Sequence, residues 1–350
     1  MKGFDDLDIY RRRTRNRLRL AMAVGAFTAI AAGVSGLAIY VLYLAIDLDF
    51  DPWVLISLFW LACIIYGILR YALGGRWVFK RVRTLSSSRG KRRLQNALDA
   101  ARLAAGMPEK VRLLVIPNRD INTFSLSLPD GSYALFATSG MAEKLPSQER
   151  EAIMAHEIAH MQSGDIILYT VMLRLTGQLA FRKKFRGHRS GGLSSFAWVI
   201  VLLASFSLVS LFLVYATAHS LDREMYSGYF KFDLWLPVVL LFVVVALTLP
   251  YLLKTLMRLA LDREREYYAD MEAAYLTRDP ACVYNALRSA AEDVIDILLL
   301  PTSLDALLFH PVVDYASYRP FRTQPTMMDR MQHLEDAFPH VNLSGYTPPQ

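Results

Sequence analysis

The sequence predicts a mainly α-helical membrane protein with four transmembrane helices and an α+β domain assembled from two separate polar segments. The mean hydropathy is +0.25 although 20% of the 350 residues are charged. Apolar residues must therefore be concentrated in blocks. Four blocks reach the length of about 20 apolar residues that a helix needs to cross a bilayer. They are Leu18–Ile46, Trp53–Leu73, Leu193–Ala218 and Leu234–Leu253.

Basic residues flank the predicted spans on one side only. Arg11–Arg19 precedes the first span, Lys80–Arg93 follows the second, and Arg182–Arg189 precedes the third. The short connections Asp47–Pro52 and His219–Asp233 are acidic or nearly balanced. An excess of Lys and Arg marks cytoplasmic loops, so we expect both termini and both larger polar segments in the cytoplasm.

This topology predicts an integral, multi-pass protein of a bacterial-type inner membrane. Its five segments are a basic cytoplasmic N-terminus (1–17), spans one and two (18–73), a cytoplasmic segment (74–192), spans three and four (193–253) and a second cytoplasmic segment (254–350). The first span is too long for a cleaved signal peptide. The net charge of +7 comes largely from the membrane flanks. The lipid bilayer is therefore an expected partner and nucleic acid is not.

The first polar segment begins with mixed helical and strand patterns. Helical spacing predicts a helix over Arg92–Ala105, ended by Gly106-Met107-Pro108. Val111–Ile116 predicts a short buried strand. Ile121–Leu128 and Tyr133–Thr138 flank the turn sequence Pro-Asp-Gly-Ser and predict a β-hairpin.

Helices are predicted for the rest of both polar segments. Ser147 is a plausible N-cap, with acidic residues in the first turn, for a helix that runs through Gln162. Asp165–Phe181 predicts a short amphipathic or interfacial helix, and the pattern leaves partial membrane embedding open. The second segment predicts a helix to about Arg278, then Ala281–Leu300, then Met327–Ala337.

The longest predicted helix of the first segment carries the sequence His156-Glu157-Ile158-Ala159-His160. On a helix, positions i and i+4 lie on one face, so both imidazoles can reach one metal ion. Glu157 lies beside them, where it can take a proton from a metal-bound water. Zinc suits such a site because imidazole and carboxylate ligands leave one tetrahedral position open. The pattern predicts metal-assisted hydrolysis with Glu157 as the catalytic base.

A third ligand is predicted on the helix after the fourth span. Glu266 and Asp270 lie at i and i+4 there. Glu266 can complete a site of two histidines and one glutamate, while Asp270 can accept a hydrogen bond from a ligand imidazole. The alternative for this stretch is a solvated charged helix. Two spans separate the histidines from Glu266, which returns both to one side of the membrane.

With these motifs the chain resembles the HtpX-like integral-membrane metallopeptidases, relatives of the CaaX prenyl endopeptidases. The resemblance covers nearly the whole chain: two spans, the HEIAH motif with Gly164-Asp165, two further spans, then Arg-Glu-x-Glu-Tyr-Tyr-Ala-Asp. Asp262 replaces the usual serine of the last motif. The resemblance implies a zincin-type, gluzincin-like catalytic domain and one Zn²⁺ per chain. Asp165 is a candidate for an outer ligand contact, although a helix cap is the commoner role.

The resemblance also implies substrate-binding residues. Asn122, Thr123 and Phe124, followed by Ser125, are similar to a family Asn-Ala-Phe-Ala segment, an edge strand that pairs with substrate backbone. Thr323 to Arg330 is similar to a family Thr-His-Pro-Pro…Arg motif, with Gln324 in place of the histidine. Arg330 is a candidate for orienting substrate or stabilising the oxyanion. The alternatives are an ordinary hairpin strand and a surface arginine.

The predicted function is that of a membrane-anchored zinc endopeptidase acting on polypeptides, chiefly membrane or membrane-associated proteins, in protein quality control. Candidate donors to the oxyanion are His310, Arg330, Tyr267 and Tyr268. The main alternative is a catalytically silent membrane scaffold that keeps the zinc site. An intramembrane protease is disfavoured because charged residues directly precede the histidine motif. A transporter is disfavoured because no span carries paired ionisable residues at its centre.

Overall fold

A computed structural model describes residues 11–22, 88–175, 264–293, 307–311 and 324–343, with isolated helical positions between 24 and 65. Most of the four predicted spans lies outside these residues. Within the part of the chain that is described, no helix is both long and apolar enough to cross a membrane. The chain divides into two compact units, of which one comprises Met1–Ala21, Arg70–Lys184 and Arg258–Gln350 and the other Met22–Leu69 and Phe185–Met257. All that follows concerns the first unit.

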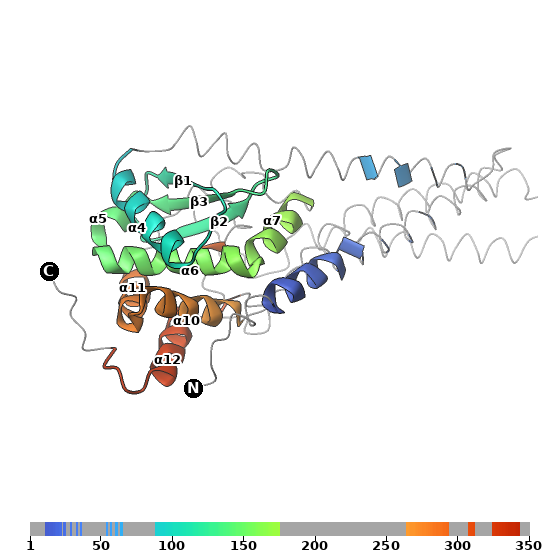
Figure 1. Ribbon diagram of the computed structural model, residues 1–350. Helices are drawn as coiled ribbons and strands as arrows, with labels where there is room; N and C mark the ends of the chain where they lie inside the picture. Colours follow the sequence, from blue (N-terminus) through green and yellow to red (C-terminus); the bar gives the residue numbers. More distant parts are fainter. Residues whose placement is uncertain are drawn as a thin grey trace, which may run out of the picture. The chain divides into compact units, whose positions relative to one another are not determined.

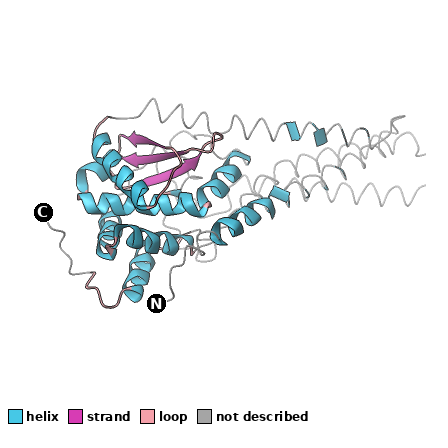
Figure 2. Ribbon diagram, in the orientation of Figure 1, coloured by secondary structure: helices cyan, strands magenta, loops and turns pink. Residues whose placement is uncertain are grey.

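A small mixed sheet forms one layer of this unit (Figures 1 and 2). Its strands are β1 (Val111–Ile116), β2 (Thr123–Ser127) and β3 (Tyr133–Thr138), in the order β1-β3-β2. The β2–β3 pair is antiparallel, which confirms the predicted hairpin, and β1 runs parallel to β3. At the turn Gly131 has φ +77°, a left-handed conformation that glycine adopts without strain. The order leaves β2 at an edge of the described sheet.

The hairpin is held by its aromatic pair as well as by its hydrogen bonds. Phe124 and Phe136 are directly opposite in the register, and their rings stack with centroids 4.5 Å apart. Both side chains are buried, together with Leu126 and Leu135. Burial of each such side chain contributes about 1.5–3 kcal/mol to stability. The stability of the hairpin therefore helps to hold the helix that packs against the sheet, described next.

Helix α6 (Ser147–Ser163) lies against this sheet and is buried along most of its length. The predicted N-cap is wrong by one residue. Pro146 is the cap, with an extended ψ of 167°, and Ser147 is already helical with no capping hydrogen bond. Proline fits here because its fixed φ suits the entry to a helix. At the other end Gly164, with φ +79°, turns the chain sharply into the next helix.

Besides the helical residues 11–22, six other helices of the described part belong to this unit. Two agree with the predicted ranges to within one residue, namely α4 (Lys91–Ala104) and α12 (Met327–Ala337). The predicted helix to Arg278 is described as α10 (Arg265–Thr277), which ends at Arg278 with φ 55°. A capping box between Thr326 and Asp329 starts α12. The short α5 (Ser139–Lys144), which follows β3 directly and is capped by Thr138, was not predicted.

Two predicted helices need correction. The helix predicted over Ala281–Leu300 is α11 (Pro280–Glu292), and it ends where Asp293 adopts an extended ψ of 146°. The predicted interfacial helix begins as α7 (Asp165–Leu175). Its first turns are buried: the Thr170 hydroxyl accepts a hydrogen bond from the backbone N–H of Ser127 on β2. Residues 165–170 therefore belong to the protein core and not to an interface. Residues 176–181 lie outside the described part.

Candidate active site

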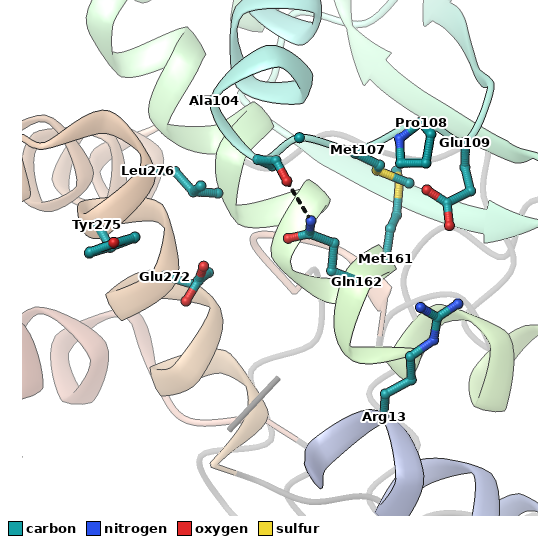
Figure 3. Close-up of a pocket in the computed structure, with 12 residues that line it drawn as sticks. Arg13, Ala104, Met107, Pro108, Glu109, Met161, Gln162, Glu272, Tyr275 and Leu276 are labelled. Carbon is teal, nitrogen blue, oxygen red and sulfur yellow. Dashed lines mark hydrogen bonds between the residues drawn. The ribbon is translucent and has the colours of Figure 1, made fainter. Parts of the chain in front are cut away.

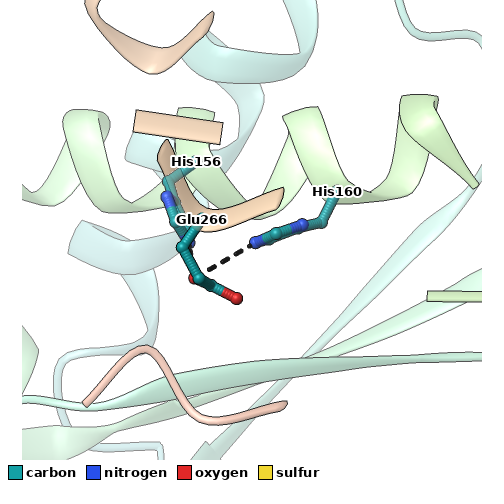
Figure 4. Close-up of side chains that lie close together, drawn as sticks. All are labelled: His156, His160 and Glu266. Atoms are coloured by element: carbon teal, nitrogen blue, oxygen red, sulfur yellow. Dashed lines mark ion pairs between the residues drawn. The ribbon is translucent and has the colours of Figure 1, made fainter. Parts of the chain in front are cut away.

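Helices α6 and α10 bring the three predicted metal ligands together (Figure 4). The Nε2 atoms of His156 and His160 lie 3.4 and 3.5 Å from the same oxygen, Oε2 of Glu266. The candidate ligand atoms all lie within 4.8 Å of one another, and each residue is at least 93% buried. The helical spacing and the third ligand predicted from the sequence therefore converge at one point.

This donor set fits a zinc ion. Zn–N and Zn–O bonds of about 2.0–2.1 Å in a tetrahedron separate two ligand atoms by about 3.3–3.4 Å. The two distances from Glu266 Oε2 to the histidine nitrogens match that separation. The imidazole rings of His156 and His160 meet edge to face, at 86° to one another and with centroids 4.7 Å apart.

The far nitrogen of His156 is held by a charged pair. Its Nδ1 lies 2.9 Å from Oδ1 of Asp270. Arg330 donates two hydrogen bonds to that carboxylate, from Nε to Oδ2 (2.7 Å) and from a terminal nitrogen to Oδ1 (2.6 Å). Both Asp270 and Arg330 are 1% exposed. A proton on Nδ1 shared with Asp270 leaves the Nε2 lone pair free for a metal.

The far nitrogen of His160 faces a carboxylate whose other side-chain partners among the described residues are neutral. Its Nδ1 lies 3.1 Å from Oδ2 of Asp165. That oxygen also accepts from the Ser163 hydroxyl at 2.8 Å. The other oxygen, Oδ1, accepts from the side-chain amide of Asn16 at 2.6 Å. The left-handed turn at Gly164 places Asp165 directly behind the histidine that precedes it by five residues.

The second oxygen of Glu266 has its own partner. Nε of Arg265 lies 2.9 Å from Oε1, and the guanidinium is over the ring of Tyr169, 4.2 Å from its centroid. Arg265 is 3% exposed. Because Oε1 is occupied in this way, Oε2 is the oxygen presented to the histidines.

The electrostatics of the centre suit a cation. Burial alone raises the pKa of Glu266, but the positive charges of His160 and Arg265 and the histidine hydrogen bonds lower it well below the usual range. Burial lowers the pKa of His160, yet Glu266 and Asp165 outweigh this and raise it to about 9. The pKa of Asp270 is likewise lowered, because Arg330 outweighs the effect of burial. The centre thus keeps its carboxylates ionised and attracts positive charge to the imidazoles.

Glu157, the predicted base, is 2% exposed and lies beside the ligands on α6. Its Oε2 accepts a hydrogen bond of 2.5 Å from the hydroxyl of Ser125, on the facing strand β2. Burial raises the pKa of Glu157, and the histidines and this hydrogen bond only partly offset the rise. A carboxylate with a raised pKa is a better proton acceptor at neutral pH than an ordinary glutamate.

The predicted substrate-binding residues of β2 lie next to this centre but already have partners. The backbone N–H of Phe309 donates to the carbonyl of Thr123 at 2.9 Å. The Asn122 side chain donates to the carbonyl of His310 and accepts from its N–H. Phe124 is buried in the sheet core. Residues 309–310 therefore cover the edge of β2 at Thr123, and the substrate-binding role of this edge stays a prediction.

The candidate oxyanion donors each have contacts in the structure, and for Arg330 these contacts occupy the donor atoms. Arg330 uses its donors on Asp270 and on the carbonyl of Phe309. Tyr267 stacks on His333 with ring centroids 4.5 Å apart, and Arg12 lies over the ring of Tyr268. The backbone of His310 bonds to Asn122, and burial and the charge of Arg330 lower its pKa. In this arrangement Arg330 positions Asp270, and its direct contact with substrate stays a prediction.

Four residues of the centre were not assigned a role from the sequence. Arg265 holds Glu266, Asn16 holds Asp165, Ser125 holds Glu157, and Phe309 packs its ring edge-on against His156 with centroids 5.1 Å apart. Arg265 was visible as a charge next to a predicted ligand. The contacts of Asn16 and Phe309 span 147 residues or more of sequence and leave no local signal.

A separate cavity of about 390 Å³ lies beside the C-terminal end of α6, where Met161 and Gln162 line it (Figure 3). Its wall includes Arg13, Glu109, Gln162, Glu272 and Tyr275. Gln162 closes one side by donating to the carbonyl of Ala105. None of the three candidate ligands lines this cavity, so it is distinct from the metal centre.

Comparison with known proteins gives a family match over the same elements. The family model described as peptidase family M48 matches residues 88–337, which include both ligand-bearing helices. The chain belongs to peptidase family M48. The family resemblance inferred from the sequence motifs is thereby confirmed, and membership makes the chain a hydrolase of the metalloprotease class.

Individual relatives within this family are distant. A protease HtpX homolog of Ligilactobacillus salivarius is 27% identical over 224 residues, which are 64% of this chain and 66% of that protein. One from Bacteroides fragilis (strain YCH46) is 22% identical over 81% of this chain and 83% of its own length. The solved structure "Crystal Structure of S. mikatae Ste24p" is 16% identical, covers 90% of this chain and 66% of that chain, and has a TM-score of 0.37. At that score it supports no statement about the fold.

Proposed function

We propose that this chain is a membrane-anchored, zinc-dependent endopeptidase with one Zn²⁺ held by His156, His160 and Glu266. The observation that carries the proposal is the convergence of both histidine Nε2 atoms on Glu266 Oε2, beside the buried carboxylate of Glu157. The separations suit tetrahedral zinc, and the ligand set has three protein members, which leaves a position for water. A purely structural zinc site normally has four protein ligands.

The chain's own residues have distinct roles in the proposed hydrolysis. A zinc ion held there supplies Lewis-acid activation of a water molecule and of the scissile carbonyl. Asp270 and Asp165 keep the protons of His156 and His160 on Nδ1, away from the centre. Glu157 takes the proton from the water and later transfers it to the nitrogen of the leaving amine. Ser125 holds Glu157 on the side of β2 during both transfers.

The substrates we propose are polypeptides of the membrane or of its surface, cleaved in protein quality control. The support is the pattern of four apolar blocks with basic flanks, together with the printed name of the relatives, protease HtpX homolog. The same pattern supports a cytoplasmic active site and cytoplasmic termini in an inner membrane of bacterial type. An extended substrate that pairs with β2 would take the place of Phe309 at the carbonyl of Thr123.

The alternative is a scaffold that keeps the zinc site without catalysis. The geometry of Glu157 is evidence against it, because a scaffold needs no buried carboxylate held beside the candidate metal ligands. Burial of that carboxylate without a role would only lower stability.

The test is cleavage of an unfolded model protein by the full chain, purified in detergent and loaded with zinc. Wild type is compared with Glu157→Gln, and zinc content is measured on both. Glutamine has the shape of glutamate but cannot accept the proton, so we expect a loss of about 10²–10⁴-fold in turnover at equal zinc content.

Each outcome decides between the proposals. Cleavage by wild type alone, with one zinc in each protein, supports the endopeptidase. One zinc in both proteins with no cleavage of unfolded or membrane-protein substrates by either supports the scaffold. A wild type that binds no zinc contradicts the ligand assignment.

A further inference from the structure

The helical residues 11–22 overlap the start of the first predicted span, Leu18–Ile46, and contact the ligand-bearing part of the protein. Asn16 is 7% exposed, although arginines flank it on both sides. Its side-chain amide donates to the carbonyl of Ser163 at 3.0 Å and to Oδ1 of Asp165 at 2.6 Å. Both protons of one amide are thus used on the turn that joins α6 to α7.

The position of Asp165 depends on two opposed sets of partners. On one oxygen are Nδ1 of His160 and the hydroxyl of Ser163, at 3.1 and 2.8 Å. The other oxygen, Oδ1, accepts a hydrogen bond from Asn16, which is its one side-chain donor among the described contacts. A carboxylate bound on both oxygens cannot rotate about its Cβ–Cγ bond without breaking a contact. Asn16 therefore restricts the direction in which Asp165 faces His160.

The chemical type of Asn16 also matters. A neutral amide binds Asp165 without neutralising it, so the full negative charge remains for the imidazole of His160. Arginines occupy positions 11, 12, 13, 15, 17 and 19 of the same helix. Arg12 lies over the ring of Tyr268, and Arg13 lies near Gly164, so this helix face is docked at several points. The neutral residue is the one that reaches the carboxylate behind the metal ligand.

We propose that Asn16 is a positioning residue for the metal centre. It orients His160 through Asp165 and so couples the helical residues 11–22 to metal affinity. The inference rests on the proposed zinc site but not on peptidase activity. Outer partners of zinc-bound histidines typically contribute 10–100-fold to metal affinity. Asn16 is separated from His160 by one further hydrogen bond, through Asp165. We therefore expect a smaller effect, with Asn16→Ala weakening zinc binding about 3- to 30-fold.

The experiment measures the zinc dissociation constant of the detergent-solubilised full chain by competition with a chelator. The variants are Asn16→Ala, Asn16→Asp, Asp165→Asn and the double variant Asn16→Ala/Asp165→Asn. Arg17→Ala, an exposed position on the same helix, is the matched control. Asn16→Asp has the same shape but places two carboxylates together, so we expect it to weaken binding more than Asn16→Ala.

A residue that only docks the helix would lower the melting temperature equally with and without zinc. A positioning residue also reduces the stabilisation that added zinc provides, because that stabilisation depends on affinity. We expect wild-type affinity for Arg17→Ala, and no further loss when Asn16→Ala is added to Asp165→Asn.

Unchanged zinc affinity in Asn16→Ala overturns the inference, and so does a loss that adds fully to that of Asp165→Asn. A wild type that binds zinc but cleaves nothing overturns the proposed peptidase and leaves this measurement intact. A wild type that binds no zinc overturns both.

Discussion

The two sides of the metal centre hold equivalent histidines by different means. On the α10 and α12 side, His156 is backed by Asp270, whose carboxylate is paired with the guanidinium of Arg330 in the protein interior. On the α7 side, His160 is backed by Asp165, whose partners are an amide and a hydroxyl. The same ring nitrogen is held in both histidines, since each Nδ1 faces a carboxylate.

This difference determines how much each carboxylate contributes to the stability of the protein and how much to the metal site alone. A buried ion pair is costly to break, because removal of one partner leaves an uncompensated charge. The Asp270–Arg330 ion pair therefore contributes to the stability of this unit as well as to the geometry of the metal site. Apart from the imidazole of His160 itself, the hydrogen-bond partners of Asp165 among the described residues are a hydroxyl and an amide, so changes there should alter the metal ligand with a smaller loss of stability than changes at Asp270.

The largest effect is expected from Arg330→Met. Loss of the guanidinium leaves Asp270 buried with the imidazole of His156 as its remaining charged-group partner, which should lower the free energy of unfolding by about 3–5 kcal/mol. The control is Arg89→Met, because the Arg89 side chain is 76% exposed and its pair with Glu143 should contribute less than about 1 kcal/mol. Denaturant unfolding of the purified variants measures both. Equal stability of Arg330→Met and wild type would remove the basis of the comparison.

The next effect compares the two carboxylates directly. Asp270→Asn and Asp165→Asn should each weaken zinc binding about 10–100-fold, since each loses the charged acceptor behind a ligand. Asp270→Asn should lower the stability of the zinc-free protein more than Asp165→Asn does, because it leaves the buried guanidinium of Arg330 without its carboxylate. Chelator competition gives the affinities, and thermal unfolding without zinc gives the stabilities. Equal destabilisation by both variants would show that the two sides do not differ.

A smaller effect is expected at Glu157, the proposed base, whose hydrogen-bond donor is Ser125 of β2. Ser125→Ala removes the donor to Glu157, and a hydrogen bond to a charged group contributes about 1.5–3 kcal/mol. We expect turnover to fall about tenfold or more with KM and zinc content unchanged. That hydrogen bond lowers the pKa of Glu157, so its loss raises the pKa, and activity on the acid side should disappear at a higher pH.

Ser125→Thr provides the control for this prediction, because it keeps the hydroxyl and β-strands favour β-branched residues. Turnover near that of wild type is expected. A fall in zinc content in Ser125→Ala would indicate that the serine supports the ligands and not the base.

The smallest effect concerns a buried carboxyl outside the centre. Burial raises the pKa of Glu149 above its ordinary 4.5, and the Ser289 hydroxyl and the charge of Arg288 do not offset this. A raised folded pKa gives stability that is complete below the unfolded pKa and is lost as pH rises through the folded value. Glu149→Gln should thus match wild type at low pH and exceed it in melting temperature at pH 7. An equal melting temperature across this range would contradict the assignment.

Much of the centre follows from local spacing in the sequence. His156, His160, Glu266 and Asp270 were identified because i,i+4 positions share a helix face, and the structure brings all four together. The β-hairpin followed from its turn residues in the same way. These features are local, so a short window of sequence contains the information.

The remainder depends on tertiary contacts that no local pattern encodes. A charged stretch on α10 looked equally compatible with a solvated helix, yet Arg265 is 3% exposed. The burial of Arg330 and of Asn16 is likewise decided by partners distant in sequence, Asp270 and Asp165. Helix ends were also less accurate: α11 ends at Glu292 because Asp293 adopts an extended conformation.

The ligands of the centre come from both polar segments of the chain, with His156 and His160 on α6 and Glu266 on α10. A metal ion held by all three acts as a cross-link that closes the intervening chain into a loop. The free energy of metal binding then opposes the separation of the two segments, as a covalent cross-link would. If a protease cut the chain between His160 and Glu266, the two fragments should stay associated with metal bound and separate more readily after chelation.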